Sequence, residues 1–286
     1  MIEAEGLGKS YWVGGDQLID YMGFHTVVEG ALRAPARWIS QSLVGVKPKS
    51  RYPVTQGHIK WALRDVTFTA AEGEVLGVVG DNGAGKSVLL KLLSRITPPS
   101  EGIARLYGRV SSMLEAGTSF HKELTGRENI RFAGAILGMT RSQIDERLDE
   151  IISFSEVEEY IDTPVKRYST GMILRLGFSV AAHLDTDIML VDEVLAVGDQ
   201  RFKRRCVDKM RSIATSGKTV VFVGHDLQVL QQISDRAILI KDGRLVMNDT
   251  PDRVVAEHLR AATESEPDRA SARAPAHRRD EHRRRS

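Results

Sequence analysis

An eight-residue glycine-rich segment, Gly80 to Ser87, constrains the fold of this chain more than any other feature. It reads Gly-Asp-Asn-Gly-Ala-Gly-Lys-Ser, and it lies between an apolar run rich in β-branched residues, 75–79, and a run with helical spacing, 88–93. A loop of this kind between a strand and a helix points backbone N–H groups at phosphate oxygens, and the helix N-terminus adds a partial positive charge. The segment therefore predicts an α/β fold with a phosphate-binding loop.

The residues of this loop have different expected roles. Its glycines let the backbone turn sharply, Lys86 can reach the β- and γ-phosphates of a nucleotide, and the Ser87 hydroxyl can bind Mg²⁺. We therefore predict that ATP and Mg²⁺ bind here; the alternative is a glycine-rich loop without a ligand. The predicted nucleotide-binding residues of the loop are Gly80, Asp81, Asn82, Gly83, Ala84, Gly85, Lys86, Ser87 and Val88.

Two further apolar runs, 188–191 and 219–223, end in side chains suited to this chemistry. The first is followed by Asp192 and Glu193, and the second by a glycine and His225. As buried parallel strands, both runs would present their carboxyl ends to the phosphate-binding loop. Asp192 can then hold Mg²⁺, Glu193 can polarise the attacking water, and His225 can contact the γ-phosphate. The alternatives are two surface acids and a structural histidine.

The pentad Tyr168-Ser169-Thr170-Gly171-Met172 stands between the loop and Asp192. This order of motifs resembles that of an ABC transporter ATPase, and the resemblance extends to about Leu259. It makes 80–87 the Walker A motif, 168–172 the signature, 188–193 the Walker B motif, 196–199 the D-loop and His225 the switch histidine. Finer features at 113–117, 120–129 and 193–199 resemble the ATP-binding subunits of bacterial polysaccharide exporters, of the O-antigen and teichoic acid type.

The resemblance implies further site residues. Ser169 and Gly171 would contact the γ-phosphate of an ATP held by another copy of the chain, and Asp199 would cross that interface. Glu115 takes the Q-loop position near Mg²⁺ and the water, where glutamine is usual. Tyr11 takes the position of the aromatic residue that stacks on adenine. A tyrosine that is simply packed or exposed is the alternative.

The resemblance also implies partners and a location. The ATPase would form a head-to-tail homodimer on a separate transmembrane permease, at the cytoplasmic face of the bacterial inner membrane, and lipid-linked polysaccharide would pass through the permease. An exporter of a lipid or small molecule is the alternative. An ABC-type ATPase acting on DNA or ribosomes is less favoured, because the chain has neither a long coiled coil nor a second cassette, and its net charge of +2 gives no bulk attraction to nucleic acid.

We predict one nucleotide-binding domain over residues 1–262 and a disordered, arginine-rich tail over 263–286. Within the domain, residues 12–60 form an insert with amphipathic helices, which either cover the sheet or contact the membrane or permease. Residues 124–165 form a helical subdomain, in which a capping-box pattern at Thr140 precedes an apolar stripe. The predicted fold class is a P-loop α/β domain with this helical subdomain and an antiparallel β part.

The composition agrees with this domain plan. A chain of 286 residues with 42% hydrophobic content can bury an α/β core and a helical subdomain. Cys206 is the only cysteine, so an intrachain disulfide is impossible and a reducing cytoplasm is the expected setting. No apolar run approaches the roughly 20 residues that cross a bilayer, and residues 1–5 lack the features of a signal peptide. Membrane association is therefore expected through a partner or a surface helix.

Overall fold

The computed structural model describes residues 1–13, 57–113, 120–192 and 200–271. The chain divides into two units, Met1–Lys9 with Ala62–Ser286, and Ser10–Trp61. The described residues of the second unit are the outer ends of two strands, β1 (Ile2–Val13) and β2 (His58–Ala70). Apart from Tyr11, every predicted site residue belongs to the first unit.

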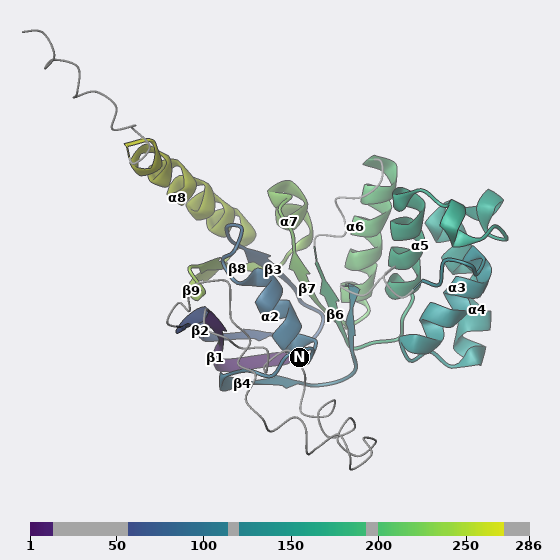
Figure 1. The fold of residues 1–286 in the computed structure, drawn as a ribbon, viewed down its shortest axis with the longest axis horizontal. Helices are drawn as coiled ribbons and strands as arrows, with labels where there is room; N and C mark the ends of the chain where they lie inside the picture. The colour runs from purple at the N-terminus through teal and green to yellow at the C-terminus, as the bar shows by residue number, and fades with distance from the viewer. Residues whose placement is uncertain (14–56, 114–119, 193–199, 272–286) are drawn as a thin grey trace, which may run out of the picture. The chain divides into compact units, whose positions relative to one another are not determined.

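A six-stranded sheet in the order β5-β6-β7-β3-β8-β9 runs through the first unit (Figure 1). Its strands are β3 (Val75–Val79), β5 (Val110–Ser112), β6 (Ile188–Val191), β7 (Thr219–Val223), β8 (Arg236–Lys241) and β9 (Arg244–Asp249). Neighbouring strands are parallel except for the antiparallel pair β8 and β9. The three predicted strands β6, β7 and β3 are consecutive in the sheet and are buried along their whole length. Because they are parallel, their carboxyl ends lie side by side.

Side chains of the sheet alternate between two hydrophobic cores. Leu76 and Val78 of β3 contribute to one core, and Val75 and Val79 contribute to the other, as the two-residue period of a strand requires. The first core also contains helix α2 (Lys86–Leu93) and strands β1 and β2. These two strands form a second, three-stranded sheet with β4 (Glu101–Leu106), in which β1 and β4 are antiparallel. The predicted antiparallel β part is thereby confirmed.

Helices cover the other face of the six-stranded sheet. Contacts join α6 to β7, α7 to β3, and α8 to β3 and β8. The bounds are α6 (Gln200–Thr215), α7 (Leu227–Ile233) and α8 (Pro251–Ser271). None of the helices within the described residues is long and apolar enough to cross a membrane.

The predicted helical subdomain is a group of helices that pack on one another. Within the predicted bounds, 124–165, it contains α3 (Gly126–Ile136), α4 (Arg141–Ser155) and the short 3₁₀ turn η2 (Glu158–Tyr160) (Figure 1). The group continues past the predicted end through the 3₁₀ turn η3 (Val165–Arg167) to α5 (Thr170–Ala182), which packs on α3 and α4. Thr140 caps α4 in a capping box with Gln143, as predicted. Ile144, Leu148, Ile151 and Ile152 of the predicted stripe are buried. The stripe therefore packs inside the protein.

Two further boundaries differ from the prediction. Helix α8 continues to Ser271, whereas the predicted tail begins at Thr263. Alanine and glutamate favour a helix over 261–266, and Thr263 Oγ1 donates to the Leu259 carbonyl at 3.0 Å, as in a helical turn. Strand β1 reaches Val13 and β2 starts at His58, so both ends of the predicted 12–60 insert are strand. The expected helices of the insert and residues 272–286 lie outside the described residues.

Candidate nucleotide-binding site

A cavity of about 240 Å³ lies at the carboxyl edge of the six-stranded sheet. The loop after β3 lines it with Asn82, Gly83 and Gly85, and the first turn of α2 lines it with residues 86–88. Asp192 lines it from the end of β6, and His225 lines it from the segment after β7. The predicted convergence of three strand ends is therefore present in the structure, because β6, β7 and β3 are neighbours in the sheet.

Lys86 is the first residue of α2, and its side chain is buried in the loop. Its Nζ donates to the carbonyl of Gly80 at 2.6 Å and to that of Asp81 at 3.0 Å. The two carbonyls hold the ammonium group beside the cavity. A phosphate there would exchange neutral acceptors for charged ones, which form stronger hydrogen bonds with a cation.

Gly85 could not be another residue in this conformation. Its φ is +110°, and a Cβ added there would lie 2.5 Å from the backbone carbonyl of Ala62. Ala62 itself lines the cavity, together with Val223 and Gly224. The sequence analysis did not identify these three residues as site residues, because small and aliphatic side chains carry no chemical signal of their own.

Ser87 and Asp192 supply the oxygen donors of the cavity that suit a hard divalent cation. Both line the same cavity although they come from different elements. Mg²⁺ is typically held by one or two protein oxygens together with substrate phosphates. A hydroxyl and a carboxylate on one small cavity fit that donor set.

The signature residues occupy a different place from this cavity. Ser169 caps α5, with its Oγ accepting a hydrogen bond from the backbone N–H of Met172 at 3.2 Å. Gly171 lies in the first turn of α5, and neither residue lines the cavity around Lys86. Ser169 and Thr170 are exposed, so this helix start is accessible from outside the chain.

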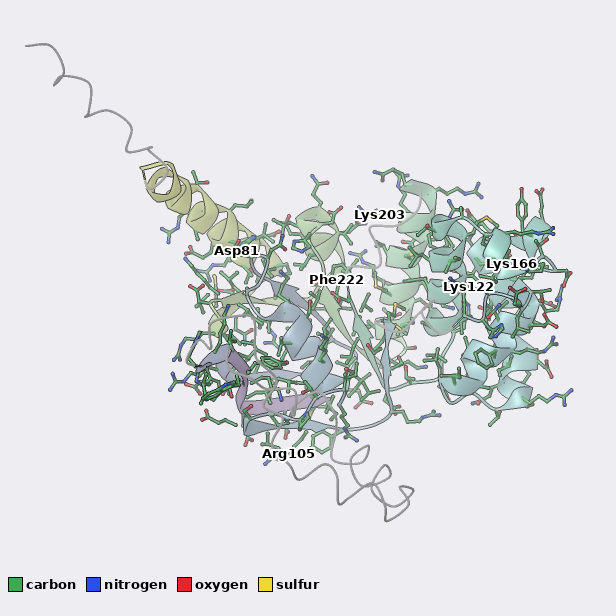
Figure 2. The ribbon with its side chains drawn as sticks, in the orientation of Figure 1. Asp81, Arg105, Lys122, Lys166, Lys203 and Phe222 are labelled. Carbon is green, nitrogen blue, oxygen red and sulfur yellow. The ribbon has the colours of Figure 1, made fainter. Side chains whose placement is uncertain are left out.

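The segment before the signature is joined to the loop that precedes α3. The backbone N–H of Val165 donates to the Leu124 carbonyl at 2.9 Å, and that of Lys166 donates to the Lys122 carbonyl at 3.0 Å. The Lys166 ammonium also pairs with Glu123 at 2.6 Å. Lys122 and Lys166 are labelled in this region in Figure 2. Two segments far apart in the sequence are thus held together just before α5.

The side chain of Asn129, a residue of α3, forms hydrogen bonds with the backbone of the loop that precedes this helix, 121–125. It is fully buried, and its Oδ1 accepts from the backbone N–H of His121 at 2.7 Å. Its amide group donates to the carbonyls of His121, Leu124 and Thr125 at 2.9–3.0 Å. A single amide side chain therefore shares its two N–H groups among three carbonyls of the loop and accepts a hydrogen bond from one backbone N–H. The structural role of Asn129 could not be inferred from its sequence position.

Tyr168, the first residue of the signature, packs against the start of α3. Burial raises the pKa of its phenol to about 12. Its hydroxyl donates to the Tyr160 carbonyl at 2.7 Å. A Cβ added at Gly126 would lie 2.3 Å from that hydroxyl oxygen and 3.0 Å from Cδ1 of Ile161. The absence of a side chain at Gly126 lets the signature segment approach.

We expect Gly126→Ala to lower the free energy of unfolding by about 1–3 kcal/mol, because the new methyl group overlaps the Tyr168 hydroxyl. Urea denaturation of the purified chain measures this change. Gly171→Ala is the matched control, since an added Cβ there meets only Ser169 Oγ, at 3.8 Å. Combining Gly126→Ala with Tyr168→Phe should restore part of the loss. Equal stability of the Gly126→Ala variant and the native chain would show that the space between Gly126 and the Tyr168 hydroxyl can accommodate a methyl group.

Several predicted site residues are not placed against the cavity. Glu115, Glu193 and Asp199 lie outside the described residues. Tyr11 is an exposed residue of β1 and belongs to the second unit of the chain. Their assigned roles stay predictions.

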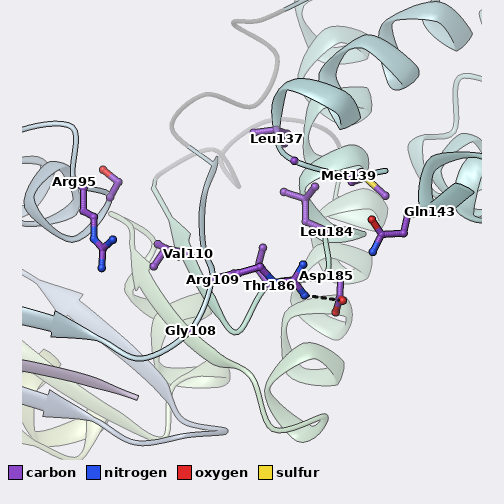
Figure 3. Close-up of a pocket in the computed structure, with 12 residues that line it drawn as sticks. Arg95, Gly108, Arg109, Val110, Leu137, Met139, Gln143, Leu184, Asp185 and Thr186 are labelled. Atoms are coloured by element: carbon purple, nitrogen blue, oxygen red, sulfur yellow. Dashed lines mark hydrogen bonds and ion pairs between the residues drawn. The ribbon is translucent and has the colours of Figure 1, made fainter. Parts of the chain in front are cut away.

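A second cavity, of about 470 Å³, is drawn in Figure 3 with the residues that line it. Val110, the first residue of β5, and Thr186, just before β6, place it at the amino ends of these parallel strands. It is therefore separate from the site at the carboxyl ends, where Lys86 lies.

The lining of this second cavity is both apolar and charged. Leu137 and Met139 come from the connection between α3 and α4, and Leu184 comes from the segment after α5. Arg109 pairs with Asp185 across 2.8 Å, as Figure 3 shows. Residues of the helical subdomain and residues next to the sheet strands therefore line the same cavity.

The fold and the carboxyl-edge site together define an ATP-binding cassette. The phosphate-binding loop after β3, a carboxylate after β6 and a histidine after β7, the strand between β3 and β6, meet on one cavity. A family model described as ABC transporter matches residues 63–196. Together with 41% identity to a relative of which the chain covers 87%, this match shows that the chain belongs to the ABC transporter ATP-binding proteins.

Curated relatives place the chain more closely. It is 41% identical over 214 residues to the O-antigen export system ATP-binding protein RfbB of Klebsiella pneumoniae, covering 75% of this chain and 87% of the relative. It is 44% identical over 215 residues to RfbB of Myxococcus xanthus, covering 75% and 49%. It is 42% identical over 201 residues to the teichoic acids export ATP-binding protein TagH of Enterococcus faecalis, covering 70% and 45%. The chain therefore spans about half the length of the last two relatives.

Solved structures agree on the fold. A dimeric ATP-binding cassette in a post-hydrolysis state with ADP and Pi matches with a TM-score of 0.64 and 19% identity, over 88% of this chain and 99% of that chain. The ATP-binding subunit of an ABC transporter matches with a TM-score of 0.65 and 18% identity, over 90% and 92%. The predicted family and fold class are confirmed.

Proposed function

We propose that this chain is the ATP-hydrolysing subunit of an exporter that moves lipid-linked polysaccharide, of the O-antigen or teichoic acid type, across the inner membrane. The observation that carries the proposal is the meeting of Lys86, Asp192 and His225 on one cavity in a chain related to O-antigen and teichoic acid export proteins. The cavity supports the ATPase chemistry, and the relatives support the cargo.

The cavity residues would divide the catalytic roles as follows. Lys86 and His225 stabilise the negative charge that develops on the γ-phosphate. Glu193, next to Asp192 in the sequence, accepts a proton from the attacking water. Ser87 and Asp192 would hold Mg²⁺, with Glu115 near it, and the ion would supply positive charge beside the phosphates.

A second copy of the chain would complete the site. Ser169 and Gly171 lie away from the cavity of their own chain and at an exposed helix start, so they are available to the ATP of another copy. The start of α5 adds partial positive charge and backbone N–H groups that suit a phosphate. Asp199 would cross the same interface, and Tyr11 would stack on the adenine ring. The dimeric state of a solved cassette with the same fold supports this arrangement.

The second cavity is the place where we expect the permease to dock. The resemblance implies that the helical subdomain and the loop at Glu115 receive short helices of the permease. Leu137, Met139 and Leu184 offer an apolar floor, and Arg95 and Arg109 offer charge beside it, which suits an amphipathic helix. Docking there would hold the chain peripherally at the cytoplasmic face of the membrane.

Deleting this chain from its native cell tests the cargo. We expect lipid-linked polysaccharide to accumulate on the cytoplasmic side and to disappear from the surface, because the permease alone has no energy source. A strain carrying Lys86→Ala should show the same defect, and a strain carrying the native chain should show none. Unchanged surface polysaccharide in the deletion strain would remove the proposed cargo and leave only the ATPase.

A further inference from the structure

The placement of His225 depends on a three-residue connection, 224–226, between β7 and α7. On one side, Val223 is held in the sheet by its pairing with Val78 of β3. His225 itself is exposed at the surface of the cavity. The backbone position of His225 therefore depends on both ends of the connection, and one of these ends is Asp226.

The two carboxylate oxygens of Asp226 have different partners. Oδ1 accepts a hydrogen bond from the backbone N–H of Val229 at 3.0 Å and so caps α7. Oδ2 forms an ion pair with the ammonium group of Lys203 on α6. This ammonium group is the main reason why the pKa of Asp226 is lowered. The first contact is local, while the second ties the connection to another helix.

Helix α6 is a firm support for such a tie. Phe202, directly before Lys203, is buried, and its ring packs edge-on against the rings of Phe154 and Phe178. Cys206 and Met210 continue the buried face of α6. Lys203 lies on α6, as labelled in Figure 2, and bridges this packed helix to the short helix α7.

We propose that Lys203 is a positioning residue for His225, acting through Asp226. The inference rests on the proposed ATP hydrolysis and assigns a role to a residue that does not line the nucleotide cavity. The pair is partly exposed, with 25% of the Lys203 side chain and 42% of the Asp226 side chain accessible. Pairs of this kind contribute little to global stability, so loss of the pair should change catalysis more than folding.

Lys203→Met keeps the aliphatic stem and removes the charge. We expect kcat for ATP hydrolysis to fall about 3- to 10-fold, because small displacements of a group that contacts the transition state are costly. KM for ATP and the thermal unfolding midpoint should stay near the native values, since the nucleotide loop and the cores are unchanged. Lys203→Arg should retain most of kcat. Asp226→Asn, which keeps a capping oxygen, should match Lys203→Met, and the double variant should be no worse than either single one.

Lys209→Met is the matched control. Lys209 lies on the same helix, is 23% exposed and pairs with Glu150 at 3.7 Å. Its loss should leave kcat unchanged. A fall in kcat of the same size in Lys209→Met and Lys203→Met would overturn the proposal, because the effect would then be a general one of α6.

A second double-mutant cycle, which combines Lys203→Met with His225→Ala, tests whether Lys203 acts through His225. In a His225→Ala background, single-turnover release of radiolabelled phosphate should show no further loss on adding Lys203→Met. An additional loss of the same size as in the native background, or an unchanged kcat for Lys203→Met alone, would overturn the proposal while leaving ATP hydrolysis intact. A native chain without ATPase activity would instead overturn the proposed function as well.

Discussion

Replacing Lys86 by alanine should lower the rate of ATP hydrolysis by about 100- to 1,000-fold, which is the usual cost of removing one hydrogen-bond donor from a developing oxyanion. The Lys86 ammonium group lies at hydrogen-bonding distance from the Gly80 and Asp81 carbonyls, inside the loop that would hold the phosphates. Its loss removes the positive charge at the position where negative charge increases. Phosphate release by the purified chain measures the rate, and titration with a fluorescent ATP analogue measures binding.

Lys91→Ala is the control for this variant. Lys91 belongs to the same helix, α2, but is exposed and does not line the cavity. Its replacement should leave hydrolysis within about twofold of the native rate, as expected for a surface change away from the site. Hydrolysis by Lys86→Ala at the native rate would exclude the loop as the catalytic phosphate site.

Replacing Glu193 by glutamine should lower turnover by about 100- to 10,000-fold, the range contributed by a general base. The variant keeps a side chain of the same size next to Asp192, so ATP should still bind. Because the bound ATP would persist, the chain should be trapped as a dimer. Phosphate release measures turnover, and size-exclusion chromatography with light scattering in the presence of ATP and Mg²⁺ measures the dimer.

A control variant and a double variant test whether the effect of Glu193→Gln comes from loss of the general base. Glu159→Gln, a change of the same type at an exposed residue of η2, should behave like the native chain. Adding Lys86→Ala to Glu193→Gln should abolish the trapped dimer, because a dimer held by ATP requires ATP binding. A normal hydrolysis rate for Glu193→Gln would remove Glu193 as the base and move that role to another group.

Much of the site could be predicted because its parts are local in the sequence. The runs that form β3, β6 and β7 are continuous and apolar, which indicates strands buried on both faces. Residues directly after such strands must emerge at their carboxyl ends. This reasoning identified Asp192 and His225 as well as the loop before α2, and both side chains line one cavity together with Asn82, Gly83 and Gly85 of the loop. The capping box at Thr140 was predictable for the same reason, since all of its bonds lie within one helical turn.

Other features could not be predicted from local patterns. The end of α8 at Ser271 differs from the prediction because a few residues with moderate helix propensity can extend a helix or leave it. The role of Asn129 depends on backbone groups of a folded loop, and the role of Gly126 depends on Tyr168, which approaches only in the folded chain. Amino-acid type alone does not specify such contacts.

The sequence by itself determined the class of the protein, the phosphate-binding loop and the side chains that follow its strands, because these depend on neighbouring residues and on backbone periodicity. The tertiary structure decided which strands are neighbours, namely β6, β7 and β3, and so which strand ends share a cavity. It also decided the approach of Ala62 to Gly85 and the pairing of Lys203 with Asp226. The physical reason is the same in each case: such contacts join groups from different elements, and packing of the whole domain brings those groups together.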